Sequence, residues 1–150
     1  MTKEKIIKQL NIFYGLELFQ VDVYTSQSKW VNDIYMRKVF ERMAVIEQQH
    51  VDNLASKIRE MGATPSKIVE MTTPYAGALT GKTLSLTHLK TALKTNIVFE
   101  REAMKMYKDF IMGVGSDEEL FELLWGNLID EDLHAVWFTN KLKELEAVTH

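Results

Sequence analysis

Two tetrapeptides, Glu47-Gln48-Gln49-His50 and Glu131-Asp132-Leu133-His134, decide how this sequence of 150 residues folds. Each lies in a segment whose apolar residues recur at helical spacing, for example Met43 and Leu54 around the first. Residues three apart share one face of a helix, so each tetrapeptide directs a carboxylate and an imidazole towards a helix interface. Because a buried, unpaired carboxylate is costly, the pattern predicts a core in which cations balance the acids.

One further glutamate lies on an apolar face about thirty residues before each tetrapeptide. Glu17 precedes Glu47 by 30 residues, and Glu100 precedes Glu131 by 31. Two divalent ions would balance four carboxylates, and carboxylate with imidazole suits iron or manganese. A purely structural bundle is the alternative, but no Lys or Arg lies on the inward faces at this level. We therefore predict a metal site formed by Glu17, Glu47, His50, Glu100, Glu131 and His134.

The remaining sequence predicts four helices, over residues 3–27, 33–61, 86–112 and 116–147. Asn32 or Asp33 is expected to cap the second helix, Gly62 to end it, and Ser116 with Glu119 to form a capping box on the fourth. Short joints near residues 29–32 and at 113–115 predict two antiparallel hairpins. Residues 62–85 are enough to run the length of a bundle. We predict an all-α, ferritin-like four-helix bundle, in which a long crossover joins two hairpins, as a single domain over residues 1–150.

The composition restricts the class of protein. Hydrophobic residues make up 46% of the chain, and the formal net charge is -3, which gives no reason to expect nucleic acid as a partner. The absence of Cys excludes disulfides, thiolate-bound zinc and a rubredoxin module. The sequence has no apolar run of 18 residues and no signal-peptide pattern, so we expect a cytoplasmic protein without a membrane span.

The six-residue pattern resembles the ferritin-like di-iron carboxylate superfamily, which includes rubrerythrins and demethoxyubiquinone hydroxylases. The resemblance implies a terminal Glu and His for each of two iron ions, namely Glu17 with His50 and Glu100 with His134. It implies that Glu47 and Glu131 bridge the ions. It also implies that Asp130, next to Glu131, accepts a hydrogen bond from His50 and fixes the tautomer of that imidazole. The corresponding residue before Glu47 is Ile46, so this support is expected on one side only.

The resemblance to individual branches is mixed. A rubrerythrin has a second inward Glu where this chain has Ala103, and a haem-binding bacterioferritin has Met where this chain has Gln48. Tyr24 and Tyr107 each lie seven residues after a predicted ligand, as in demethoxyubiquinone hydroxylases. We expect both tyrosines to be core residues whose hydroxyl groups need partners. The alternative is that they bind ligand carboxylates or supply an electron.

These features predict an oxidoreductase that reacts with O₂ or H₂O₂ at two iron ions and that oxidises or hydroxylates an organic substrate. Manganese or a mixed iron–manganese pair fits the same ligands, and the sequence does not identify the electron donor. The alternative is ferritin-type iron oxidation and storage. We expect a homodimer. Residues 76–83 fit a loose P-loop pattern, which we reject because helices flank it. The apolar segment 74–86 is expected to cover one end of the bundle, or to form a dimer contact or a membrane-surface patch.

Overall fold

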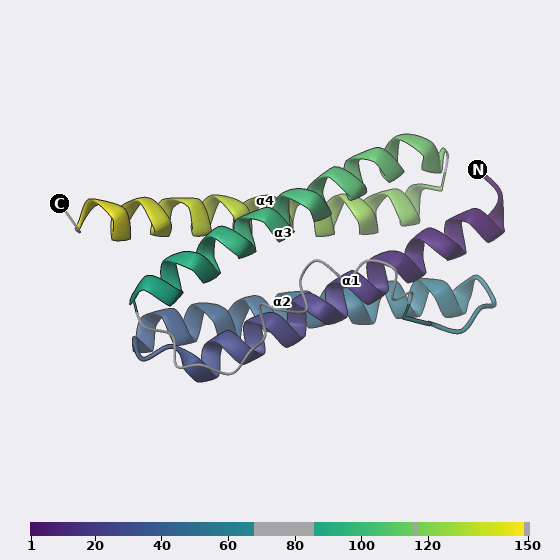
Figure 1. Cartoon of the computed structure of the whole chain (residues 1–150). Helices are drawn as coiled ribbons and strands as arrows, with labels where there is room; N and C mark the ends of the chain where they lie inside the picture. Colours follow the sequence, from purple (N-terminus) through teal and green to yellow (C-terminus); the bar gives the residue numbers. More distant parts are fainter. Residues whose placement is uncertain (68–85, 116, 149–150) are drawn as a thin grey trace.

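A computed structural model describes residues 1–67, 86–115 and 117–148 (Figure 1). In these residues the chain forms four helices: α1 (Lys3–Trp30), α2 (Ile34–Glu60), α3 (Leu86–Val114) and α4 (Glu118–Ala147). Helices α1 and α2 run antiparallel as one hairpin, and α3 and α4 form the second (Figure 1). The hairpins meet through α2 with α4 and through α1 with α3. The predicted all-α four-helix bundle is therefore confirmed.

The start of each second helix in a hairpin is capped by an aspartate. Asp33 Oδ1 accepts a hydrogen bond from the backbone N–H of Met36 at 2.7 Å, and Asp117 Oδ1 accepts one from Leu120 at 3.0 Å. Asp33 was one of two expected caps. The predicted capping box from Ser116 is wrong, because the N-cap of α4 is the next residue, Asp117. Ser116 itself lies outside the described residues.

The helix ends differ from prediction by a few residues. Gly62 follows α2 with a φ of 79°, as expected for a residue in the left-handed region. Helix α1 continues to Trp30, because the N–H of Val31 still bonds to the carbonyl of Gln27 at 3.1 Å. Helix α3 continues through Gly113, and Gly115, with a φ of 78°, follows its end.

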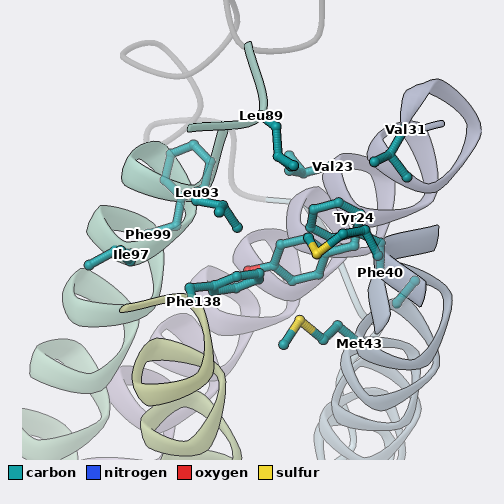
Figure 2. Close-up of a cluster of buried hydrophobic side chains, with 12 residues drawn as sticks. Val23, Tyr24, Val31, Phe40, Met43, Leu89, Leu93, Ile97, Phe99 and Phe138 are labelled. Carbon is teal, nitrogen blue, oxygen red and sulfur yellow. The ribbon is translucent and has the colours of Figure 1, made fainter. Parts of the chain in front are cut away.

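The core consists of two apolar clusters on either side of a polar layer. The first cluster lies towards the joint between α1 and α2, contains residues of all four helices and includes Tyr24, Phe40, Leu93, Phe99 and Phe138 (Figure 2). The second lies towards the other end of the bundle and includes Leu10, Phe13, Ile58, Phe110, Leu120 and Leu124. Along every helix the predicted metal ligands fall between residues of the first cluster and residues of the second. The clusters therefore fix the four helices above and below the ligands.

Two sequence expectations concern membranes and residues 74–86. None of the helices in the described ranges is both long enough and apolar enough to span a membrane. The apolar segment 74–86 and the P-loop-like residues 76–83 fall outside the described residues, apart from Leu86 at the start of α3.

Candidate metal centre

All six predicted ligands lie in the polar layer at the middle of the bundle. Their side chains come from four different helices and point inward. Each is between 0% and 4% exposed: Glu17, Glu47, His50, Glu100, Glu131 and His134. The structure therefore brings together every residue of the predicted set.

The imidazole of His50 faces three of the carboxylates through Nδ1. This atom lies 3.0 Å from Glu47 Oε2, and 3.4 Å from both Glu17 Oε2 and Glu131 Oε1. The other ring nitrogen, Nε2, lies 3.0 Å from Asp130 Oδ2, on the outer side of the cluster. The ring therefore presents Nδ1 to the acids, while the partly exposed Asp130 carboxylate holds the opposite edge.

The imidazole of His134 faces Glu47, which His50 also contacts, and the fourth carboxylate, Glu100. Its Nδ1 lies 2.9 Å from Glu47 Oε1 and 3.6 Å from Glu100 Oε1. These nitrogen and oxygen atoms lie within ion-pair distance but are not aligned as hydrogen bonds. Within the described part of the chain, both ring nitrogens of His134, both carboxylate oxygens of Glu47 and Oε1 of Glu131 therefore lack a hydrogen-bond partner. A native core rarely leaves so many buried polar atoms without hydrogen bonds, so a further binding partner is expected there.

The ligand atoms fall into two groups of four that share two residues. Glu17, Glu47, His50 and Glu131 offer atoms that all lie within 4.8 Å of one another, and so do Glu47, Glu100, Glu131 and His134. Glu47 and Glu131 belong to both groups. This arrangement has the form of a pair of adjacent cation sites with two shared carboxylates.

Two tyrosines connect the hairpins at the ligand layer. Tyr24 of α1 donates its hydroxyl hydrogen to Glu100 of α3, and Tyr107 of α3 donates to Glu17 of α1. Burial raises the pKa of both phenols well above the usual value, and the neighbouring carboxylates raise it further. Both hydroxyl groups therefore stay protonated and serve as donors to the carboxylates.

Two polar residues of the layer were missed by the sequence analysis. Gln20 is fully buried, and its Nε2 lies 3.2 Å from Glu100 Oε2 and 3.4 Å from Glu131 Oε2. Asn127 donates from Nδ2 to the Tyr107 hydroxyl at 3.0 Å. The available signal was spacing, because Gln20 follows Glu17 by three positions and Asn127 precedes Glu131 by four.

The electrostatics of the cluster are those of crowded acids around two imidazoles. Burial and the charge of nearby carboxylates raise the pKa of Glu17 and of Glu131 well above the ordinary value. Burial acts in the same direction on Glu47, but the imidazoles of His134 and His50 outweigh it and lower the pKa of Glu47 to about 2. For His134, burial lowers the pKa, but the adjacent Glu100 and Glu47 raise it to about 11. Without metal, protons therefore supply the positive charge that the carboxylates need.

Among the described residues, only the two histidines form ion pairs with the four core glutamates. The alternative of a bundle whose inward acids meet Lys or Arg is thus not supported by these contacts. Carboxylate oxygens and imidazole nitrogens are ligands that iron and manganese accept. The donor set and the unsatisfied atoms together fit a pair of such ions.

The model of the Ferritin-like domain family matches residues 7–148 of this sequence. The chain belongs to the ferritin-like family. No curated protein matches it significantly in sequence.

Solved structures show the same ferritin-like fold at low sequence identity. A bacterioferritin of Desulfovibrio desulfuricans with a di-iron site has a TM-score of 0.80 at 20% identity, over 97% of this chain and 82% of that one. A dodecameric thioferritin of Bacteroides fragilis, described as a bacterioferritin-related protein, has a TM-score of 0.81 at 17% identity, over 99% and 90%. The ferritin-like part of a two-domain protein of Anabaena variabilis has a TM-score of 0.75 at 16% identity, over 96% and 40%.

Proposed function

We propose that this ferritin-like protein is a di-iron oxidoreductase that transfers electrons from ferrous iron to O₂ or H₂O₂. The supporting observation is the fully buried cluster of four Glu and two His, which fits two ions. One ion would be held by Glu17 and His50, the other by Glu100 and His134, with Glu47 and Glu131 shared. A bound ferrous pair supplies two electrons to a small oxidant. Manganese or a mixed pair remains chemically compatible.

The residues around the cluster have separate tasks in this proposal. Tyr24 and Tyr107 hold the terminal carboxylates by hydrogen bonds, which fixes the direction in which those acids point. Asp130 orients His50 from outside the cluster. The enclosure of all six ligands keeps bulk water away from them. Oxidation of an organic substrate stays a sequence-based prediction, and the sequence does not identify the electron donor.

A second function, iron oxidation followed by storage, is favoured by the structural neighbours. These include a bacterioferritin and a dodecameric thioferritin, and in that case iron is the cargo as well as the reactant. The two functions differ in assembly and capacity. Storage requires a large hollow shell that takes up many iron ions per chain, whereas the expected homodimer would hold about two iron ions per chain. Measuring the mass of the native assembly and its maximal iron content therefore separates them.

The test of the proposed function is metal stoichiometry with a matched control. Purified protein loaded with Fe²⁺ without oxygen should hold close to two ions per chain by elemental analysis. The double variant Glu47→Ala/Glu131→Ala removes both shared ligands and should hold fewer than one. The control Glu102→Ala/Glu122→Ala removes two exposed acids from α3 and α4 and should still hold two. Each loaded protein is then mixed with O₂ and, separately, with H₂O₂ in a stopped-flow instrument.

Three outcomes would contradict the proposal. Wild-type protein that binds no iron excludes a metal centre. An unchanged metal content in the Glu47→Ala/Glu131→Ala variant excludes these two residues as shared ligands. A loaded protein that reacts with neither oxidant faster than free Fe²⁺ does would leave the metal site in place but exclude the redox function.

A further inference from the structure

The ligand layer has an internal two-fold correspondence that relates the two hairpins. Residues of α1 correspond to residues of α3, and residues of α2 to residues of α4, because each half carries a Glu followed by a Glu-x-x-His, 30 residues later in the first half and 31 in the second. The contacts follow it: Tyr24 donates to Glu100, and Tyr107 donates to Glu17. Departures from this correspondence identify places where the two cation positions differ.

The first departure concerns the outer nitrogen of each histidine. His50 Nε2 lies 3.0 Å from Asp130, the residue immediately before Glu131. The corresponding residue before Glu47 is Ile46, which has no polar atom in its side chain. His134 Nε2 is buried and makes no hydrogen bond to any described residue. One imidazole is thus oriented by a carboxylate, and the other is not.

The second departure concerns Gln20, whose counterpart on α3 is the fully buried Ala103. The Gln20 amide donates to one oxygen of Glu100 and one of Glu131, while its own Oε1 is buried without a partner. A donated hydrogen bond withdraws negative charge from a carboxylate, so Glu100 offers less charge to a cation. Glu17 receives no amide of this kind from Ala103. Both departures act against the position formed by Glu100 and His134.

We infer that the two metal positions are unequal, so that the Glu17–His50 position fills first and the Glu100–His134 position binds its ion more weakly. This rests on the proposed function, because it presupposes a two-ion site. A carboxylate behind a ligating imidazole fixes its tautomer and raises its basicity, and losing such a partner typically costs 10–100-fold in metal affinity. Asp130 is therefore a positioning residue for the first ion. The second ion exchanges with the solution more readily than the first.

The experiment titrates the metal-free full chain with Co²⁺ under anaerobic conditions, followed by calorimetry and by visible absorption. Wild-type protein should bind two ions in two steps, the first at least about 10-fold tighter than the second. Asp130→Asn should weaken the first step by about 10–100-fold, so that the two steps merge. Ile46→Asp should strengthen the second step by about 10-fold. The control Val45→Asp adds the same charge at the exposed neighbouring residue and should change neither step.

The outcomes separate this inference from the proposed function. The inference is overturned if the wild type binds its two ions in equal steps, or if the steps of Asp130→Asn match those of the wild type. In either case the binding of two ions still supports the metal centre. No Co²⁺ binding at all overturns the proposed function itself. Circular dichroism checks the fold of Ile46→Asp. If that variant loses helix content, Asp130→Asn decides the question alone, because its side chain is 42% exposed and tolerates the change.

Discussion

Raising the pH of the metal-free protein from about 5.5 to about 7.5 should destabilise it. Folding raises the pKa of Glu17 and Glu131 above the ordinary 4.5, chiefly through burial. It also raises the pKa of His134 from 6.5 to about 11, where nearby carboxylates outweigh burial. In this window the folded state therefore binds more protons than the unfolded state, and stability falls as pH rises. Glu47, with a pKa of about 2, is ionised in both states and contributes no slope here.

The magnitude follows from the number of extra protons. Each proton bound only by the folded state changes the free energy of unfolding by about 1.4 kcal/mol per pH unit. We count one net proton as a lower bound, because the neighbouring acids share their ionisation. Two pH units then cost about 3 kcal/mol. For a chain of this size, 1 kcal/mol corresponds to about 2–4 °C, so the melting temperature should fall by about 6–12 °C.

The assay is thermal unfolding followed by circular dichroism after treatment with a chelator. The variant Glu17→Gln/Glu131→Gln cannot take up or release these protons, so its melting temperature should vary with pH less than half as steeply. Asp132→Asn removes an exposed acid next to Glu131 and should keep the wild-type slope. Metal-loaded protein should show a shallower slope, because the ions replace the protons. A metal-free melting temperature that rises steadily across this range would refute the reasoning.

Three further predictions concern the packing that holds the layer in place. Gln27 and Asn96 exchange two buried hydrogen bonds, of 2.9 and 2.8 Å, between α1 and α3. Gln27→Leu should therefore lower the free energy of unfolding in urea by about 1–3 kcal/mol. The double variant Gln27→Leu/Asn96→Leu should lower it by less than the sum of the two single changes. Phe13 stacks on Tyr107 with ring centroids 4.2 Å apart, so Phe13→Ala should cost about 3–5 kcal/mol in the same assay. Asp33→Ala removes the cap of α2 and should lower the urea midpoint by an amount equivalent to about 1 kcal/mol, whereas an unchanged midpoint would contradict the capping role.

The cluster of four Glu and two His in the core could be predicted from sequence because the spacings that indicate it are local. The spacing of Glu47 and His50 places both on one helix face whatever the rest of the chain does. The apolar residues around them require that face to be buried. Two short joints then make hairpins, and hairpins bring the second Glu-x-x-His opposite the first.

The contacts between hairpins could not be predicted in the same way. Tyr107 and Glu17 are separated by 90 residues, and their pairing depends on how α1 and α3 are placed against each other. In the sequence, Gln20 is an ordinary polar residue. Its role depends on the tertiary structure, in which α3 and α4 place Glu100 and Glu131 against its amide. The cap of α4 was predicted one residue too early because Ser and Asp are both good capping residues. Which of the two caps the helix depends on the residue at which the helical backbone begins, here Glu118.

The position of the polar layer between two apolar clusters explains how the chain tolerates it. Four buried carboxylates oppose folding, since burial favours their neutral forms. The clusters on either side contain the large aromatic and aliphatic side chains of all four helices, so they fix the helices independently of the acids. The acids are consequently held close together, with oxygens left unsatisfied, before any ion binds. This arrangement would favour ion binding, because two cations would relieve both the repulsion and the missing contacts at once.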